Sequence, residues 1–169
     1  PMFDTKLHWV QSIVPHRLAL TSCPIRTIDL NEQVATWRDA GVEVVASLLE
    51  TREADDYGVA KESTICETFG IEFLSFPIPD HGIPSSEQDV ALLIDRIHAS
   101  LVAGKAVAIH CYAGIGRTGI IAACVLNQIG IPVSDVFHLL RVSRGYVMPE
   151  SYEQREWVKR FVAGRAGAL

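Results

Sequence analysis

The residues with the clearest chemistry lie in the stretch HCYAGIGRTG, residues 110–119, where a cysteine and an arginine flank two glycines. The apolar runs AVAI before it and IIAACVL after it indicate a buried strand and a buried helix, so the stretch forms the turn between them. Gly114 and Gly116 permit positive φ and close backbone approach, so successive backbone N–H groups can turn inward as an anion nest at the helix N-terminus. The residues predicted to bind an oxyanion in this way are Tyr112, Ala113, Gly114, Ile115, Gly116 and Arg117.

Cys111 and Arg117 supply reactive groups to this nest. The planar guanidinium of Arg117 suits two phosphate oxygens at once, and the positive field of the nest favours the thiolate form of Cys111. A ring of amides with a guanidinium also matches the trigonal transition state of phosphoryl transfer, which carries charge on three equatorial oxygens. Thr118 is placed to donate a hydrogen bond to the sulfur when the thiolate leaves, and His110 orients the loop by hydrogen bonding. The stretch therefore predicts nucleophilic attack on phosphorus.

A phosphoester leaving group needs a proton, and Asp80 in the segment PDHGIP is the predicted general acid. The proline and glycine content of this segment indicates a loop, in which Pro79 stiffens one side and Gly82 offers a hinge. The loop can then close over the nest as a lid. In the hydrolytic half of the reaction, the Asp80 carboxylate accepts a proton from water. His81 is interpreted as a loop-packing residue.

The elements that must position these groups alternate between strand and helix. The stretch of residues 50–70 is polar and helix-tolerant and carries only a weak signal. The pattern predicts an α/β fold with a central twisted, mainly parallel sheet of roughly four to five strands flanked by helices, the C-terminal helices covering one face. Strands are expected at residues 17–21, 42–49, 71–78 and 106–109, and helices at 31–40, 86–104, 117–129, 134–144 and 150–163.

Length and composition limit the function classes. The 169 residues fit a single domain spanning 1–169, in which Pro1 before Met2 is read as an expression scar. Residues are 49% hydrophobic and the net charge is -5, which argues against nucleic acid or membrane partners. The apolar run GIIAACVL is too short to span a bilayer, and no signal peptide opens the chain. The four cysteines show no metal-ligand spacing, so we expect no bound metal and a reducing, cytoplasmic location. We also expect no cofactor, and we expect the protein to be a monomer.

The motif Cys-x5-Arg-Thr, with His110 before the cysteine, resembles the signature loop of the protein tyrosine phosphatase superfamily. The short chain is similar to its dual-specificity and kinase-associated phosphatase branch, from about residue 17 to residue 161. The resemblance implies the fold of that superfamily and metal-independent hydrolysis of phosphoproteins through a cysteinyl-phosphate. The PDHG segment is similar to the movable acid loop of these enzymes, although Ile78 stands where the tyrosine-specific members carry tryptophan.

The resemblance also implies supporting residues. The segment ESYEQREWV is similar to the helix start whose glutamines position the hydrolytic water, and Gln154 matches the second of them. Glu150 stands where the first would be. Relatives brace the loop arginine with a carboxylate, for which Glu50 and Glu53 are candidates, but we interpret both as part of a solvated charged turn.

Several alternatives stay open. Phosphotyrosine is the favoured substrate, with phosphoserine and phosphothreonine left open. Tyr112 and Ile115 stand where lipid-phosphatase relatives carry lysines, which disfavours inositide substrates. A phosphate-binding adaptor would normally lack the cysteine, the arginine or the acid, and the loop spacing disfavours sulfur transfer. Cys23 or Cys66 is a candidate for a disulfide with oxidised Cys111, whereas Cys124 is interpreted as a core residue.

Overall fold

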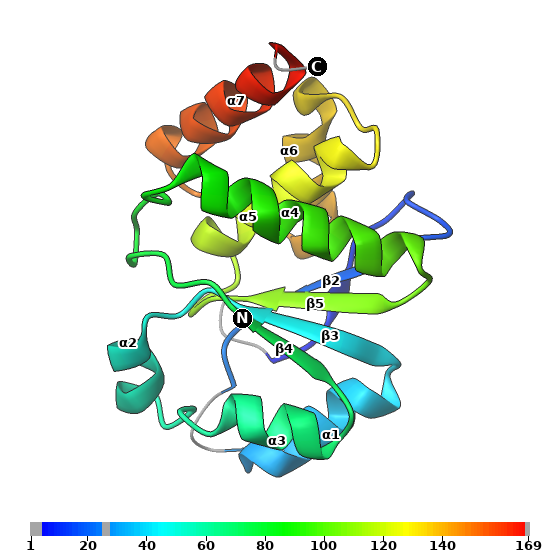
Figure 1. The fold of residues 1–169 in the computed structure, drawn as a ribbon, viewed down its shortest axis with the longest axis vertical. Coiled ribbons are helices and arrows are strands. Elements are labelled where there is room, and N and C mark those ends of the chain that lie inside the picture. The colour runs from blue at the N-terminus through cyan, green and yellow to red at the C-terminus, as the bar shows by residue number, and fades with distance from the viewer. Residues whose placement is uncertain (1–4, 25–27, 168–169) are drawn as a thin grey trace.

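The computed structural model describes residues 5–24 and 28–167, which fold as a central sheet between two helical layers (Figure 1). The strands are β1 (His8–Trp9), β2 (Arg17–Thr21), β3 (Val42–Ser47), β4 (Glu72–Ser75) and β5 (Ala106–His110). The helices are α1 (Leu30–Asp39), α2 (Thr51–Asp56), α3 (Glu62–Thr68), α4 (Glu87–Val102), α5 (Gly116–Gln128), α6 (Val133–Arg144) and α7 (Tyr152–Gly167).

The strand order is β1-β2-β5-β3-β4, and all neighbours are parallel except β1, which pairs antiparallel with β2 at one edge. The register places Thr21 and Ser47 level with His110, and Ser75 level with Ser47. Four parallel strands therefore end at one edge of the sheet, where the loops that follow them meet. The predicted α/β fold with a mainly parallel sheet is confirmed, whereas the two-residue strand β1 was not predicted.

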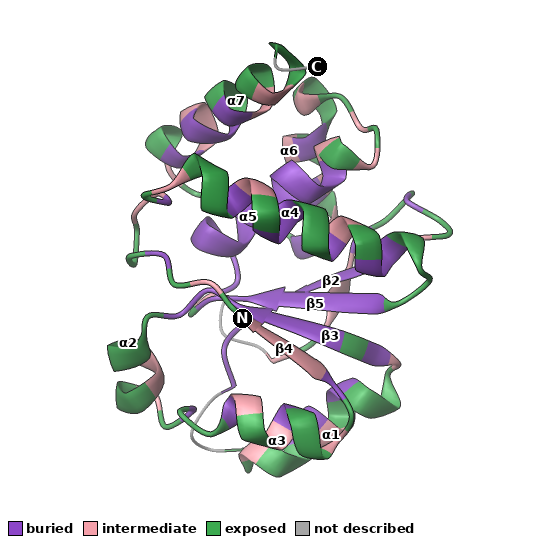
Figure 2. Ribbon diagram, in the orientation of Figure 1, coloured by how far each residue is buried: buried purple, intermediate pink, exposed green. Residues whose placement is uncertain are grey.

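Helices α4, α5, α6 and α7 cover one face of the sheet, and α1 and α3 cover the other (Figure 1). Side chains alternate between these layers along β5: Val107 and Ile109 join the core under α4 and α5, while Ala108 packs with Trp37 of α1. The central strands are buried almost throughout, as Figure 2 shows. Burial on both faces explains why these strands read as nearly continuous apolar runs in the sequence.

Local signals account for the N-terminal boundaries of α1, α2 and α4. The Asp29 carboxylate accepts hydrogen bonds from the backbone at the start of α1, and the Ser86 hydroxyl does the same for α4. The weakly patterned stretch 50–70 forms the short helices α2 and α3. Helix α2 begins with a capping box in which the Glu50 N–H donates to the Glu53 carboxylate at 2.8 Å.

Two predictions concern the chain terminus and membrane spans. Pro1 and Met2 lie outside the described residues, so their interpretation as an expression scar has no structural counterpart. Within residues 5–24 and 28–167, no helix is long and apolar enough to cross a membrane.

Candidate active site

The predicted oxyanion loop leaves the carboxyl end of β5 and runs directly into α5. His110 is the last residue of the strand and Gly116 the first of the helix. Cys111, only 3% exposed, lines a cavity of about 250 Å³ together with the loop and the acid segment. The lining residues are Tyr57, Asp80, His81, Cys111, Tyr112, Ala113, Gly116, Arg117 and Glu150. The structure therefore brings the expected nucleophile, arginine and acid to one cavity.

The two loop glycines meet different requirements. Gly114 has φ +71°, and a Cβ there would lie 2.2 Å from the carbonyl oxygen of Thr21. Gly116 does not adopt positive φ, but a Cβ there would lie 2.8 Å from the Glu150 carboxylate. Gly114 is thus needed for backbone conformation and contact with β2, and Gly116 for space beside α7.

Thr118 lies in the first turn of α5, directly beneath the loop. Its hydroxyl donates a hydrogen bond to the Cys111 sulfur at 3.2 Å, and both side chains are buried. The expected contact between these two residues is therefore present in the structure, and a donor at this distance stabilises negative charge on the sulfur.

Arg117 is 1% exposed and is held from several sides. Nη1 and Nη2 donate to the two oxygens of Glu53 at 2.7 and 2.9 Å. Nη1 also donates to the Ile78 carbonyl at 3.0 Å, and Nη2 to Asp80 at 3.0 Å. Among the described residues, no group accepts a hydrogen bond from the buried Nε–H of Arg117. Within the described part of the chain, this N–H is thus the guanidinium donor that has no protein partner.

Glu53 is the carboxylate that braces Arg117. Our interpretation of this residue as part of a solvated turn is wrong: its side chain is 14% exposed and forms a two-point ion pair. Burial alone would raise the pKa of Glu53, but the hydrogen bonds from Arg117 and the Glu50 backbone outweigh it, so the pKa lies below its ordinary value. For Arg117, burial opposes the charged form, while Glu53 and the negative charges near it raise the pKa. Both groups therefore stay ionised.

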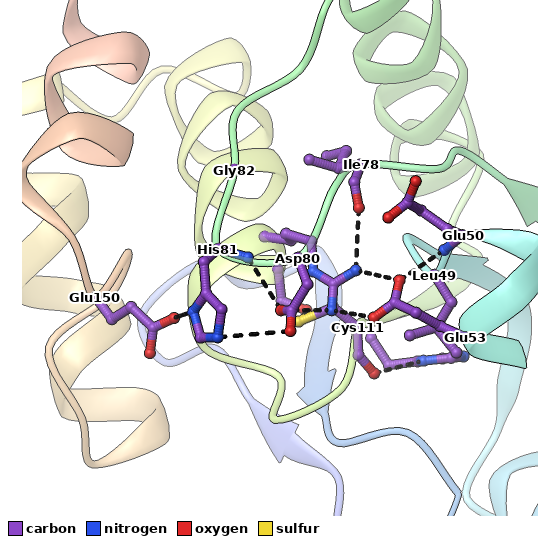
Figure 3. A network of polar contacts seen from close by, with 12 residues as sticks. Leu49, Glu50, Glu53, Ile78, Asp80, His81, Gly82, Cys111 and Glu150 are labelled. Carbon is purple, nitrogen blue, oxygen red and sulfur yellow. Dashed lines mark hydrogen bonds and ion pairs between the residues drawn. The ribbon is translucent and has the colours of Figure 1, made fainter. Parts of the chain in front are cut away.

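Asp80 reaches the cavity from the loop after β4, as its position in PDHGIP predicted. Its Oδ1 accepts from Arg117 Nη2 and from the His81 N–H, both at 3.0 Å. His81 itself adopts φ +59°, and its ring lies 3.5 Å from Asp80 and 3.4 Å from Glu150. His81 is therefore not a loop-packing residue: its side chain is 79% exposed and lies between two carboxylates (Figure 3).

His110 forms a buried pair that the sequence did not suggest. Its Nε2 lies 2.6 Å from the Glu62 carboxylate and its Nδ1 lies 3.1 Å from the Cys111 carbonyl. When Glu62 is ionised, both partners are oxygen acceptors, so both ring nitrogens carry hydrogen and the ring is an imidazolium. Burial lowers the pKa of His110, but the charge and hydrogen bond of Glu62 outweigh this and raise it above its ordinary value. The expected orienting contact with the loop is present.

Helix α7 reaches the site through Gln154, which is fully buried. Its amide donates to the Gly82 carbonyl of the acid loop at 3.1 Å and lies against Gly116. Gln154 thus joins the acid loop to the oxyanion loop, and its predicted role in positioning water stays a prediction.

Tyr57, the C-cap residue that follows α2, forms one wall of the cavity. Its ring stacks on that of Tyr112, with centroids 4.5 Å apart and an angle of 21° between the planes. Burial and the charges of Glu53 and Asp80 raise the pKa of the Tyr57 phenol, which therefore stays protonated. Sequence reasoning missed Tyr57 because it lies in the weakly patterned stretch 50–70.

The remaining cysteines are buried and free. Cys23 packs with Leu49 and Val59, and Cys66 packs on the Trp37 side of the sheet, whereas Cys111 belongs to the core on the opposite side. Burial raises the pKa of Cys66 and of Cys124 to about 12, and that of Cys23 as well. Within the described residues, no group of three His, Cys, Asp or Glu side chains is arranged to hold a metal ion.

The sequence was compared with models of known protein families. The family model described as "Polymorphic toxin system, DSP-PTPase phosphatase" matches residues 20–131. The chain belongs to this family of phosphatases. The predicted membership of the dual-specificity branch of the protein tyrosine phosphatase superfamily is confirmed, and the phosphatase is a hydrolase of that class.

Individual proteins resemble the phosphatase over most of its length. Cyclin-dependent kinase inhibitor 3 of Sus scrofa is 27% identical over 150 residues, covering 85% of this chain and 69% of that protein. Phosphatidylglycerophosphate phosphatase PTPMT2 of Arabidopsis thaliana is 27% identical over 135 residues, covering 79% and 57%. The crystal structure of a kinase associated phosphatase (KAP) with its catalytic-site cysteine changed to serine has a TM-score of 0.87, with 21% identity and 98% of both chains covered. That last likeness bears on the fold alone.

Proposed function

We propose that the phosphatase hydrolyses phosphotyrosine in protein substrates, through a cysteinyl-phosphate on Cys111 and with Asp80 as general acid. The observation that carries this proposal is the convergence of Cys111, Arg117 and Asp80 on one cavity. No metal is needed in this scheme, because Arg117 and the loop amides neutralise the phosphoryl oxygens. We further propose that the domain acts alone, as a cytoplasmic monomer.

The first step transfers the phosphoryl group to sulfur. The substrate phosphate binds the loop amides and the free Nε–H of Arg117, and it displaces Asp80 from Nη2. The Cys111 thiolate attacks phosphorus, forming the S–P bond as the bond from phosphorus to the tyrosyl oxygen breaks. Asp80, in its acid form, gives its proton to that oxygen, so tyrosine leaves neutral.

The second step releases phosphate. Water attacks phosphorus opposite the sulfur, the Asp80 carboxylate takes a proton from that water, and the S–P bond breaks. The Thr118 hydroxyl donates a hydrogen bond to the departing thiolate, which lowers the barrier by stabilising the leaving group. Asp80 ends the cycle in its acid form, ready for the next substrate. Gln154 holds the acid loop over the site through this step.

The aromatic wall of the cavity supports phosphotyrosine as the preferred substrate. Tyr57 and Tyr112 line the cavity beside Cys111, with their rings stacked on one another. A phosphotyrosine ring that packs against them would add about 0.5–1.5 kcal/mol beyond area burial. A phosphoserine or phosphothreonine side chain reaches the same nest without this stacking. One relative is named cyclin-dependent kinase inhibitor 3, and because a cyclin-dependent kinase is itself a protein, this name supports a protein as substrate.

A lipid phosphomonoester is the second candidate, because one relative is named a phosphatidylglycerophosphate phosphatase. The charged lining disfavours it: Asp80 and Glu150 line the cavity, and among the described residues that line it only Arg117 and His81 are basic. An additional headgroup phosphate would meet these carboxylates rather than lysines.

The test compares wild type with Cys111→Ser on p-nitrophenyl phosphate, a phosphotyrosine peptide, its phosphothreonine counterpart and phosphatidylglycerophosphate in micelles, all with chelator present. We expect phosphotyrosine to have the highest kcat/KM, the serine variant to be inactive, and rapid acid quenching to trap one phosphate on Cys111. A higher kcat/KM for the lipid would replace the proposed substrate. Turnover in the serine variant would exclude the covalent mechanism.

A further inference from the structure

Three consecutive carbonyls of the oxyanion loop are held by hydrogen bonds from outside the cavity. The Cys111 carbonyl accepts from His110 Nδ1 at 3.1 Å, and the Tyr112 carbonyl accepts from the Cys23 N–H at 2.9 Å. The Ala113 carbonyl has two donors, Ser22 Oγ at 3.1 Å and Arg144 Nη2 at 3.0 Å. We call Ser22 and Arg144 the carbonyl clamp.

The direction of these carbonyls determines the direction of the amides that follow them. In a planar trans peptide the N–H points opposite to the preceding C=O. If the carbonyls of residues 111, 112 and 113 are held away from the cavity, the N–H groups of residues 112, 113 and 114 face towards it. Such a run of amides is an anion nest, so the hydrogen bonds behind the loop set the binding groups in front of it.

We propose that Ser22 and Arg144 are positioning residues that hold the Ala113–Gly114 peptide with its N–H directed at the substrate phosphate. A flip of this peptide would bring the Ala113 carbonyl oxygen into the nest, where it would repel an oxyanion. Glycine at 114 makes such a flip easier, because no Cβ restricts its φ. The clamp opposes the flip with two donors, one of them charged.

The surroundings of the clamp suit this role. Ser22 follows β2 and is fully buried, and Arg144, the last residue of α6, is 3% exposed. Arg144 also lies 3.4 Å from Ser22 Oγ through Nη2 and 3.2 Å from His8 through Nη1, so its guanidinium ties β1, β2 and α6 to the loop. A buried guanidinium is costly unless its donors are used, and here one of them is used on a loop carbonyl.

The inference rests on the proposed function for its consequence in catalysis, but its test measures anion binding directly. Titration calorimetry with tungstate, a tetrahedral oxyanion that is not hydrolysed, is carried out on wild type, Ser22→Ala, Arg144→Met and the control Arg141→Met. Arg141 lies on the same helix, is exposed and is outside the site. Urea unfolding of each variant establishes that the sample is folded, and kcat/KM on p-nitrophenyl phosphate is measured in parallel.

We expect Ser22→Ala to weaken tungstate binding about 3- to 10-fold and Arg144→Met roughly 10- to 100-fold, the range for hydrogen bonds involving charged groups. The losses in kcat/KM should be of similar size, and Arg141→Met should match wild type. Because both clamp residues act on one carbonyl, the double variant should lose less than the product of the single losses.

Folded Ser22→Ala and Arg144→Met that bind tungstate as wild type does would overturn the proposal, since a purely structural role lowers stability and leaves affinity unchanged. If Arg144→Met does not fold, Ser22→Ala decides alone, because it removes a single hydroxyl. A wild type that binds tungstate but hydrolyses no phosphoester would end the proposed function and leave the clamp to be judged on the binding data.

Discussion

The buried pair of Glu62 and His110 makes the stability of the phosphatase depend on pH in a defined direction. Both side chains are at most 3% exposed and lie 2.6 Å apart. Replacement by Glu62→Gln keeps the shape but removes the negative charge that holds the imidazolium. Breaking a buried ion pair from one side costs about 3–5 kcal/mol, and we expect the lower end because the glutamine oxygen still accepts a hydrogen bond.

The pH dependence follows from the raised pKa of His110, which Glu62 causes against the opposing effect of burial. A group whose pKa is higher in the folded state contributes stability that is fully present below its unfolded value, about 6.5 for histidine. That contribution is lost as the pH rises through the folded pKa. The gap in unfolding free energy between wild type and Glu62→Gln should therefore be widest below about pH 6.5 and narrow as the pH rises above that value.

Urea unfolding followed by tryptophan fluorescence measures this gap, with Glu67→Gln on the same helix as the exposed control. The control should stay within about 0.5 kcal/mol of wild type at every pH. A gap that stays constant or grows as the pH rises would mean that the ring is neutral in the folded state. The imidazolium assignment would then be wrong, and His110 would orient the loop as a neutral ring.

Four further changes probe the site. Asp80→Asn should lower kcat by roughly 10²- to 10⁴-fold for a phenyl phosphate, and much less for p-nitrophenyl phosphate; equal losses would assign the proton to another group. Glu53→Gln should lower kcat/KM about 10- to 100-fold by loosening Arg117, and unchanged tungstate affinity would contradict that bracing role. Tyr57→Ala should raise KM about 3- to 10-fold for a phosphotyrosine peptide and leave a phosphothreonine peptide unaffected, since only a phosphotyrosine ring can pack against the aromatic wall that Tyr57 forms with Tyr112. Thr118→Ala should slow breakdown of the cysteinyl-phosphate about 10- to 100-fold, seen as a burst of phenol before the steady state; a slowed burst would place the effect in the first step instead.

The oxyanion loop could be predicted from the sequence because its chemistry is local. Cys111 lies in the loop before α5, and Arg117 and Thr118 lie in the first turn of that helix. Residues this near in sequence are also near in space, so their spacing in the sequence was enough to predict that they meet. The flanking apolar runs located the loop at the end of a buried strand, and the α/β alternation placed that end with those of the neighbouring strands. Asp80 was accessible to the same reasoning, since the proline and glycine residues around it mark a loop.

The residues that support the loop carried no such signal. Glu53 and Glu62 belong to short helices in a polar stretch whose pattern is typical of an exposed segment, yet both side chains turn inward and pair with buried cations. A carboxylate is buried only where a partner compensates its lost hydration, and the partner lies 64 residues away for Glu53 and 48 for Glu62. No periodicity in the sequence records that distance.

The amino-acid sequence by itself thus determined the reactive loop, the acid segment and the layered fold, because turn chemistry and hydrophobic periodicity act between near neighbours. Only the tertiary structure decided which carboxylates brace Arg117 and His110, which ring stacks on Tyr112, and which donors hold the Ala113 carbonyl. Those contacts join segments whose meeting depends on strand order and on the packing of helices against the sheet.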